Sequence, residues 1–253
     1  MAQMLTLVYG FLAYTVFLGA FLYAIGFVGN LLVPKSIDSG ATGPLTEAIV
    51  IDALLLGLFA VQHSVMARPA FKRAWTKIVP TQIERSTYVL LASSILLLLY
   101  WQWRPIAGTL WDAGSTPLGI ALLGLSGVGW IIVLLSTFMI NHFDLFGLRQ
   151  VTLYFQRRKY TPVSFVTRGF YKIVRHPIML GFIIAFWATP TMTYGHLLFA
   201  VATTAYILIA LQFEEHDLLE ADRQSYERYR RSTPMLIPIP KGKSAPADVR
   251  ERV

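Results

Sequence analysis

The sequence predicts an all-α, polytopic membrane protein with about six membrane segments, a C-terminal helical hairpin and a helix outside the bilayer at the C-terminus. Hydrophobic residues make up 55% of the 253 residues and charged residues 14%, whereas a soluble domain carries roughly 25% charged residues. Asp, Glu, Lys and Arg are missing from four long stretches, which are residues 1–34, 86–103, 113–141 and 177–213. The chain has no cysteine, which excludes disulfide frameworks and thiolate metal sites.

The first four membrane segments follow from these uncharged stretches. A helix of about 20 apolar residues crosses about 30 Å of hydrocarbon. Suitable runs lie near residues 5–33, 45–66, 86–103 and 117–140. The second run contains Asp52, and we expect this carboxylate to make a structural hydrogen bond.

The last two segments form a hairpin. Residues 177–213 comprise 37 residues, which is too long for one crossing at about 1.5 Å per residue. Pro190 and Gly195 lie near the middle of the stretch and favour a turn there. We therefore predict arms near 177–189 and 194–213, the first of them short.

The distribution of basic residues predicts the orientation. Of the 22 Lys and Arg residues, 20 lie in segments 67–85, 142–176 and 214–253. Six spans place these segments on one face, which the positive-inside rule makes cytoplasmic. We therefore expect a protein of the bacterial inner membrane with both termini in the cytoplasm. The net charge of +8 then points to anionic lipid headgroups as partners and not to nucleic acid.

Several cytoplasmic elements are predicted in addition. Residues 67–79 have the spacing of a helix that lies on the membrane surface. Residues 212–231 are rich in helix formers and are expected to continue the last span. We expect one domain over residues 1–240 and a disordered tail over 241–253.

Two polar clusters flank the predicted hairpin. Residues 175–181 (RHPIMLG) precede it, and Glu214, Glu215, Tyr226 and Tyr229 follow it. A helical hairpin brings its ends together, so these clusters are expected to meet at the cytoplasmic surface. Free backbone N–H groups at a helix start can hold a carboxylate. The two glutamates can accept from hydroxyls or an ammonium group, and the tyrosines offer aromatic surface to a flat base.

The order and spacing of these motifs resemble the isoprenylcysteine carboxyl methyltransferase superfamily of membrane enzymes. The resemblance implies that S-adenosylmethionine binds between the last hairpin and the C-terminal helix. The residues that it implies for the cofactor pocket are His176, Pro177, Gly181, Glu214, Glu215, Tyr226 and Tyr229. Met179 and the pair Asp222-Arg223 depart from the superfamily pattern and argue against prenylated protein as the acceptor.

Segments 60–80, 83–91 and 141–151 extend the resemblance to one branch, the bacterial methanethiol S-methyltransferases, which is itself similar to the NnrU-like membrane proteins. This resemblance implies methylation of methanethiol, with hydrogen sulfide as a further candidate, to give dimethyl sulfide. An isoprenoid or lipid-borne acceptor, a non-enzymatic NnrU-like protein and a transporter stay open as alternatives.

A thiol needs a proton acceptor, because its thiolate is the better nucleophile. His142, Asp144 and Asn141 follow the fourth span, and we predict them as the catalytic group. Either Asp144 orients His142 in its basic tautomer, or His142 acts alone. Gln62, His63 and Phe143 are predicted to line the substrate pocket. We expect no metal site, and the oligomeric state is left open.

Overall fold

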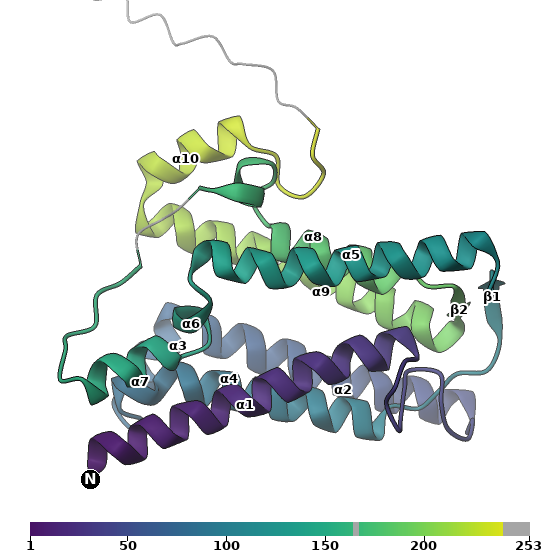
Figure 1. Cartoon of the computed structure of the whole chain (residues 1–253), viewed down its shortest axis with the longest axis horizontal. Coiled ribbons are helices and arrows are strands. Elements are labelled where there is room, and N and C mark those ends of the chain that lie inside the picture. Colours follow the sequence, from purple (N-terminus) through teal and green to yellow (C-terminus); the bar gives the residue numbers. More distant parts are fainter. Residues whose placement is uncertain (164–166, 240–253) are drawn as a thin grey trace, which may run out of the picture.

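The computed structural model describes residues 1–163 and 167–239, so the predicted disordered tail at 241–253 lies outside the described residues. Six helices run along the molecule (Figure 1): α1 (Ala2–Gly29), α2 (Leu45–Ala67), α4 (Thr81–Gln102), α5 (Pro117–Ile140), α8 (Pro177–Trp187) and α9 (Tyr194–Ala221). Within the described part of the chain, all of them except the 11-residue α8 are long and apolar enough to cross a membrane. This confirms an all-α polytopic membrane protein.

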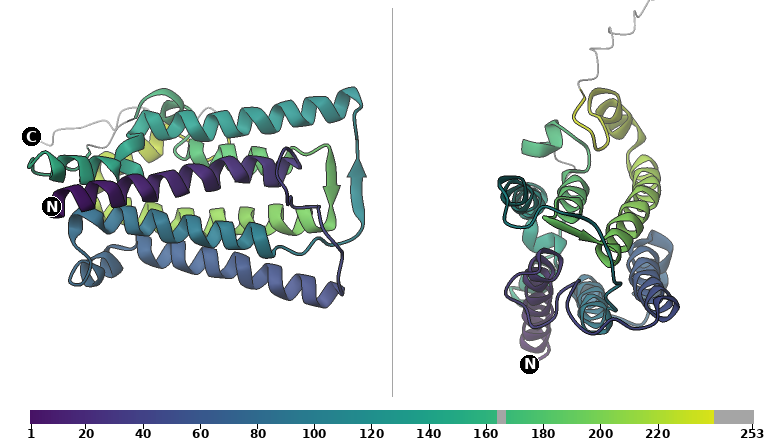
Figure 2. Two further views of the ribbon diagram at one scale, coloured as in Figure 1. Left: turned by 60° about the horizontal axis from the view of Figure 1, so that its bottom comes forward. Right: turned by 90° about the vertical axis from the view of Figure 1, so that its right-hand side faces the viewer.

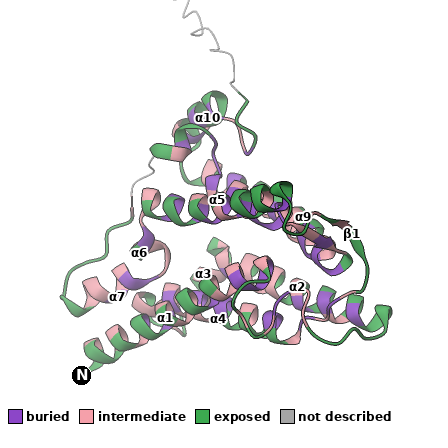
Figure 3. Ribbon diagram, turned by 45° about the vertical axis from the view of Figure 1, so that its right-hand side comes forward, coloured by how far each residue is buried: buried purple, intermediate pink, exposed green. Residues whose placement is uncertain are grey.

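The helices form two layers, with α5, α8 and α9 in one and α1, α2 and α4 in the other (Figures 1 and 2). Phe27, Trp103 and Phe199 pack where the layers meet. Many large apolar side chains, Leu5 and Leu12 among them, are exposed on the outside of the bundle. Figure 3 shows exposed residues along the outer faces of the helices. Apolar surface of this extent marks a lipid-facing protein.

One end of the bundle is closed by a small antiparallel sheet of β1 (Thr109–Asp112) and β2 (Thr191–Thr193). The second strand connects α8 to α9, which confirms the predicted hairpin. Asp52 lies near this end, fully buried, and accepts a hydrogen bond from the Arg104 backbone N–H at 2.9 Å. The structural hydrogen bond expected for this carboxylate is therefore confirmed.

The opposite end carries the short helices (Figure 2), namely α3 (Pro69–Trp75), α6 (His142–Leu145), α7 (Leu148–Phe155), the 3-10 helix η1 (Gly169–Lys172) and α10 (Arg223–Ser232). The N-terminus lies at this end as well. The helix predicted over 67–79 is present as α3 but is shorter, and it begins with Pro69 in its first turn. Proline is favoured there because its missing N–H would have no helical partner.

The predicted continuation of the last span over 212–231 is interrupted. The backbone leaves the helical region at Asp222, with φ −152° and ψ 83°, and its side chain accepts the Ser225 backbone N–H at 3.1 Å. An aspartate in this role begins a new helix. The chain therefore turns between α9 and α10, and α10 folds back over the end of the hairpin.

Helices α5 and α8 approach each other through glycines. A Cβ atom added to Gly181 would lie 2.7 Å from the Gly129 carbonyl oxygen, and one added to Gly129 would lie 2.6 Å from the Gly181 carbonyl oxygen. Both obstacles are backbone atoms, so they cannot move aside as a flexible side chain would. Small residues at such a crossing let membrane helices pack closely.

We therefore expect Gly181→Val to lower the midpoint of thermal unfolding in detergent, because α8 is forced away from α5. Overpacking of this kind costs about 1–3 kcal/mol. Gly124→Ala, on α5 but with open space around its Cβ position, serves as the control and should leave the midpoint unchanged. Equal midpoints for the two variants would contradict the close contact.

Candidate active site

The two clusters that flank the hairpin meet, as predicted. The Arg175 guanidinium contacts Glu215 Oε1 of α9, with Nε at 2.8 Å and Nη2 at 2.5 Å. The His176 Nε2 atom lies 3.2 Å from the same oxygen, and Arg230 Nε lies 3.6 Å from Oε2. Arg175, His176 and Glu215 are each only 6% exposed, so this is a buried charge network.

The segment around α10 completes the cluster. Arg175 Nη1 donates to the Thr233 carbonyl oxygen at 2.7 Å, and the Arg175 backbone N–H donates to the Pro234 carbonyl oxygen at 2.9 Å. The Tyr229 hydroxyl donates to the Tyr171 carbonyl oxygen at 2.6 Å. Burial raises the pKa of Tyr229 to about 12 and raises that of Tyr226. Both tyrosines are therefore neutral at physiological pH.

The two neighbouring glutamates differ in their surroundings. Glu215 is buried among cations, whereas the Glu214 side chain is 48% exposed. Glu214 Oε2 lies 3.8 Å from His176 Nδ1, which is longer than a hydrogen bond. Glu214 therefore keeps acceptor capacity for a ligand, while the acceptor capacity of Glu215 is used within the protein.

Pro177 and Gly181 shape α8 and its packing. Pro177 is fully buried in the first turn of α8, directly after His176, and Gly181 faces the backbone of α5. The residues around them nevertheless fit a zwitterionic ligand with hydroxyls and a flat ring system. An exposed carboxylate, a buried histidine at the start of a helix and two tyrosine rings 6.1 Å apart offer the required contacts.

His142 lies in an aromatic enclosure at the start of α6. Its ring stacks on Phe138 with centroids 4.1 Å apart and is 4% exposed. The Nδ1 atom lies 2.8 Å from Thr137 Oγ1, and Nε2 lies 2.8 Å from the Tyr14 hydroxyl. Thr137 donates its hydroxyl proton to the Leu134 carbonyl oxygen, so it accepts from Nδ1–H, and Nε2 is left to accept from Tyr14. Burial lowers the pKa of His142, which keeps the ring neutral.

The predicted pairing of Asp144 with His142 is wrong. Asp144 Oδ1 accepts from Arg149 Nη1 at 2.8 Å, and its Oδ2 accepts from the Tyr160 hydroxyl at 3.3 Å. Asn141 caps α6 by accepting the Asp144 backbone N–H at 3.1 Å. Because α6 begins at His142, the histidine and aspartate two residues apart point in different directions.

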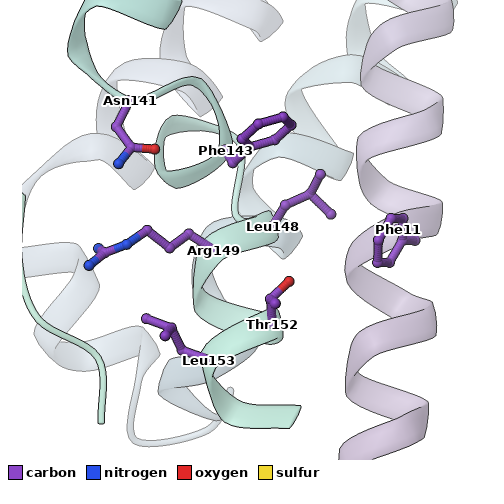
Figure 4. Close-up of a pocket in the computed structure, with 7 residues that line it drawn as sticks. All are labelled: Phe11, Asn141, Phe143, Leu148, Arg149, Thr152 and Leu153. Atoms are coloured by element: carbon purple, nitrogen blue, oxygen red, sulfur yellow. The ribbon is translucent and has the colours of Figure 1, made fainter. Parts of the chain in front are cut away.

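A shallow pocket of about 360 Å³ lies beside this group (Figure 4). Most of its lining is apolar, and the residues are Phe11, Asn141, Phe143, Leu148, Arg149, Thr152 and Leu153. Of the three residues predicted for the substrate pocket, Phe143 lines this one. Gln62 and His63 lie on α2 and belong to a different part of the bundle.

Sequence reasoning did not include the partners of His63. The Tyr88 hydroxyl of α4 lies 2.9 Å from His63 Nδ1 and 3.0 Å from Nε2. Beside it, Ser64 bonds the Tyr206 hydroxyl of α9 at 3.1 Å. Gln62 donates to the Met66 sulfur at 3.1 Å. Tyr88 lies within residues 83–91, which carried part of the resemblance, but nothing in the sequence indicated its contact with α2.

The chain belongs to the NnrU family of membrane proteins. The model of this family, described as "NnrU protein", matches residues 53–233. Within it, the chain belongs with the methanethiol S-methyltransferases, which are enzymes. It is 58% identical to the "Methanethiol S-methyltransferase" of Mycobacterium tuberculosis over 95% of this chain and 98% of that protein. It is 56% identical to "Methanethiol S-methyltransferase 2" of Bradyrhizobium diazoefficiens over 94% of this chain and 91% of that protein. It is 52% identical to the "Methanethiol S-methyltransferase" of Crocosphaera subtropica over 94% of both chains. No solved structure matches the chain.

A methyltransferase needs a methyl donor, and the residues around Glu214 fit an organic one. Among the described residues, no group of three or more His, Asp and Glu side chains could hold a metal ion.

Proposed function

We propose that this protein transfers the methyl group of S-adenosylmethionine to methanethiol and so produces dimethyl sulfide at the cytoplasmic face of a bacterial inner membrane. The chain is 56–58% identical, over nearly its full length, to enzymes named for methanethiol, and this supports methanethiol as the acceptor. The Arg175–Glu215–His176 network, with Glu214 at its edge, is the observation that carries the donor site. The basic residues gathered in three segments support cytoplasmic termini and contacts with anionic headgroups.

The donor pocket is assigned to His176, Glu214, Tyr226 and Tyr229, framed by the buried pair of Arg175 and Glu215. Glu214 would bind the ammonium or the ribose hydroxyls, and one tyrosine ring would contact the base. When bound, S-adenosylmethionine supplies an electrophilic methyl group on a cationic sulfur. The surrounding residues orient it and exclude water, which favours a step that neutralises charge.

The acceptor is a small apolar thiol that dissolves in the bilayer, so it can arrive through the lipid-facing side of the bundle. Its proton needs an acceptor within hydrogen-bond reach. Two histidines are candidates. One is His142, predicted with Asn141 and Asp144 as the catalytic group, and the other is His63, predicted with Gln62 and Phe143 in the substrate pocket.

The direct test is headspace gas chromatography on membranes that contain the protein, supplied with S-adenosylmethionine and methanethiol. We expect dimethyl sulfide from the wild-type protein and a loss of about 100-fold or more in a variant that lacks the proton acceptor. His142→Ala is measured beside it. Dimethyl sulfide from both proteins would keep the reaction and remove His142 from it.

Two other results would change the proposal. Membranes that bind S-adenosylmethionine but form no dimethyl sulfide would indicate another acceptor. Wild-type protein that does not bind S-adenosylmethionine at all would overturn the methyltransferase assignment for this chain.

A further inference from the structure

We propose that Tyr88 and His63 bind the thiol and accept its proton, which makes this pair, and not His142, the acid–base group of the proposed methyl transfer. The inference rests on the proposed function. It assigns a role to Tyr88, which sequence reasoning did not single out, and it places the acceptor between α2, α4 and α9.

The first observation is the geometry of the pair. The Tyr88 oxygen lies almost equally far from the two ring nitrogens of His63, at 2.9 and 3.0 Å. The hydroxyl is therefore within hydrogen-bond distance of both nitrogens, and a small rotation of either side chain aligns it with the nitrogen that carries no proton. The ring of His63 stacks on Phe59 with centroids 5.0 Å apart, which holds it in this position.

The second observation is that the pair faces the helix that carries the donor site. Ser64, next to His63, bonds Tyr206 of α9 at 3.1 Å. Arg68 Nη1, directly after the end of α2, lies 2.9 Å from Asp217 Oδ2 of α9, three residues after Glu214. A thiol bound to Tyr88 would therefore lie near α9, the helix that carries Glu214.

The third observation is the local charge. The Arg85 guanidinium lies 5.4 Å from the centre of the Tyr88 ring. Positive charge near a thiol favours its thiolate. The charged and titratable groups around the pair are Arg85 of α4, Arg68 directly after α2, and Glu214 and Tyr206 of α9.

His142 differs in its partners and in its place in the bundle. Both of its ring nitrogens are occupied, and their partners, Thr137 and Tyr14, belong to α5 and α1. Figures 1 and 3 place α6 on one side of α5 and α10 on the other. We therefore assign His142 the role of joining α1 to the end of α5.

The step balances as follows. The thiol proton passes to the Tyr88 oxygen while the Tyr88 proton passes to His63, which becomes an imidazolium ion. The thiol sulfur forms a bond to the methyl carbon, and the pair of electrons of the broken carbon–sulfur bond stays on the donor sulfur. The imidazolium proton is then lost to water, so each turnover releases one proton.

The test compares Tyr88→Phe with Tyr14→Phe, which removes the hydroxyl from the other histidine–tyrosine pair. Tyr9→Phe is the control, because Tyr9 lies on α1 and bonds the Thr87 hydroxyl at 3.0 Å. We expect kcat/KM for methanethiol at pH 7 to fall about 100-fold or more in Tyr88→Phe and to be unchanged in Tyr9→Phe. Tyr88→Phe and Tyr9→Phe should both bind the product S-adenosylhomocysteine as tightly as the wild type does. Calorimetry measures this binding and so tests whether the donor site is intact.

Raising the pH provides a second readout that a merely structural role would not move. Aliphatic thiols ionise near or above the value of about 8.5 for cysteine, so the thiolate fraction rises about tenfold per pH unit below it. We expect Tyr88→Phe and His63→Gln to regain activity from pH 7 to 9 with this slope, while the wild type changes less.

A fall with pH rescue in Tyr14→Phe, but not in Tyr88→Phe, would overturn the inference and make His142 the acceptor. Wild-type activity in Tyr88→Phe would overturn it as well. Absence of dimethyl sulfide from the wild-type protein would instead be a failure of the proposed function, so the two failures are distinguishable.

Discussion

Replacing Glu215 by alanine is expected to lower the free energy of unfolding by about 3–5 kcal/mol, because it leaves a buried guanidinium without its counter-ion. Arg175 is 6% exposed and gives two of its nitrogens to Glu215 Oε1. In the variant this charge keeps neutral acceptors, such as the Thr233 carbonyl oxygen, in place of its counter-ion. Thermal and denaturant unfolding in detergent micelles measures the loss.

The control for this prediction is the double variant Glu215→Leu with Arg175→Met. Replacing both partners of a buried ion pair by apolar residues is often close to neutral, so the double variant should be more stable than either single variant. If Glu215→Ala unfolds at the wild-type midpoint, the pair does not hold α8 to α9. Donor binding should be lost in both variants, because the loop that carries His176 would no longer be fixed.

The membrane segments could be predicted because the signal is local. A run of about 18 or more residues with little or no charge indicates a span wherever it occurs, and Pro190 with Gly195 divides the last stretch at the place where β2 lies. The meeting of residues 175–181 with Glu214 and Glu215 was also predictable, because a helical hairpin brings the start of its first arm close to the end of its second arm.

Contacts between segments that are distant in the sequence could not be predicted. Tyr14 bonds His142 across 128 positions, and Tyr88 bonds His63 across 25. Both depend on which helices pack together and on the rotation of each helix about its axis. Several spans here are apolar on every side, so no polar stripe in the sequence indicates that rotation.

The break at Asp222 was missed for a different reason. Residues 212–231 are helix formers on both sides of it, and propensity is a weak guide when tertiary contacts compete. The packing of Tyr229 against η1 and of Arg175 against Thr233 requires α10 to turn back over the hairpin. This turn brings Tyr226 and Tyr229 to the proposed donor site.

Glu214→Gln is expected to weaken the binding of S-adenosylmethionine about 10-fold to 100-fold while leaving the unfolding midpoint unchanged. The carboxylate is 48% exposed and 3.8 Å from His176 Nδ1, so the fold depends little on its charge. A hydrogen bond to a charged group contributes about 1.5–3 kcal/mol, which corresponds to this loss of affinity. Calorimetric titration of the purified protein measures it.

The matched control for Glu214→Gln is Glu220→Gln. Glu220 lies on the same helix with a 68% exposed side chain that pairs with His216 at 3.2 Å, so it carries the same charge at a site away from the donor pocket. If Glu220→Gln weakens binding as much as Glu214→Gln, the effect is one of net charge and not of contact. If Glu214→Gln binds normally and Glu215→Gln folds but does not bind, the roles of the two glutamates are exchanged. The ligand would then have to displace Arg175 from Glu215 Oε1, because this oxygen accepts both hydrogen bonds that the guanidinium donates to the carboxylate.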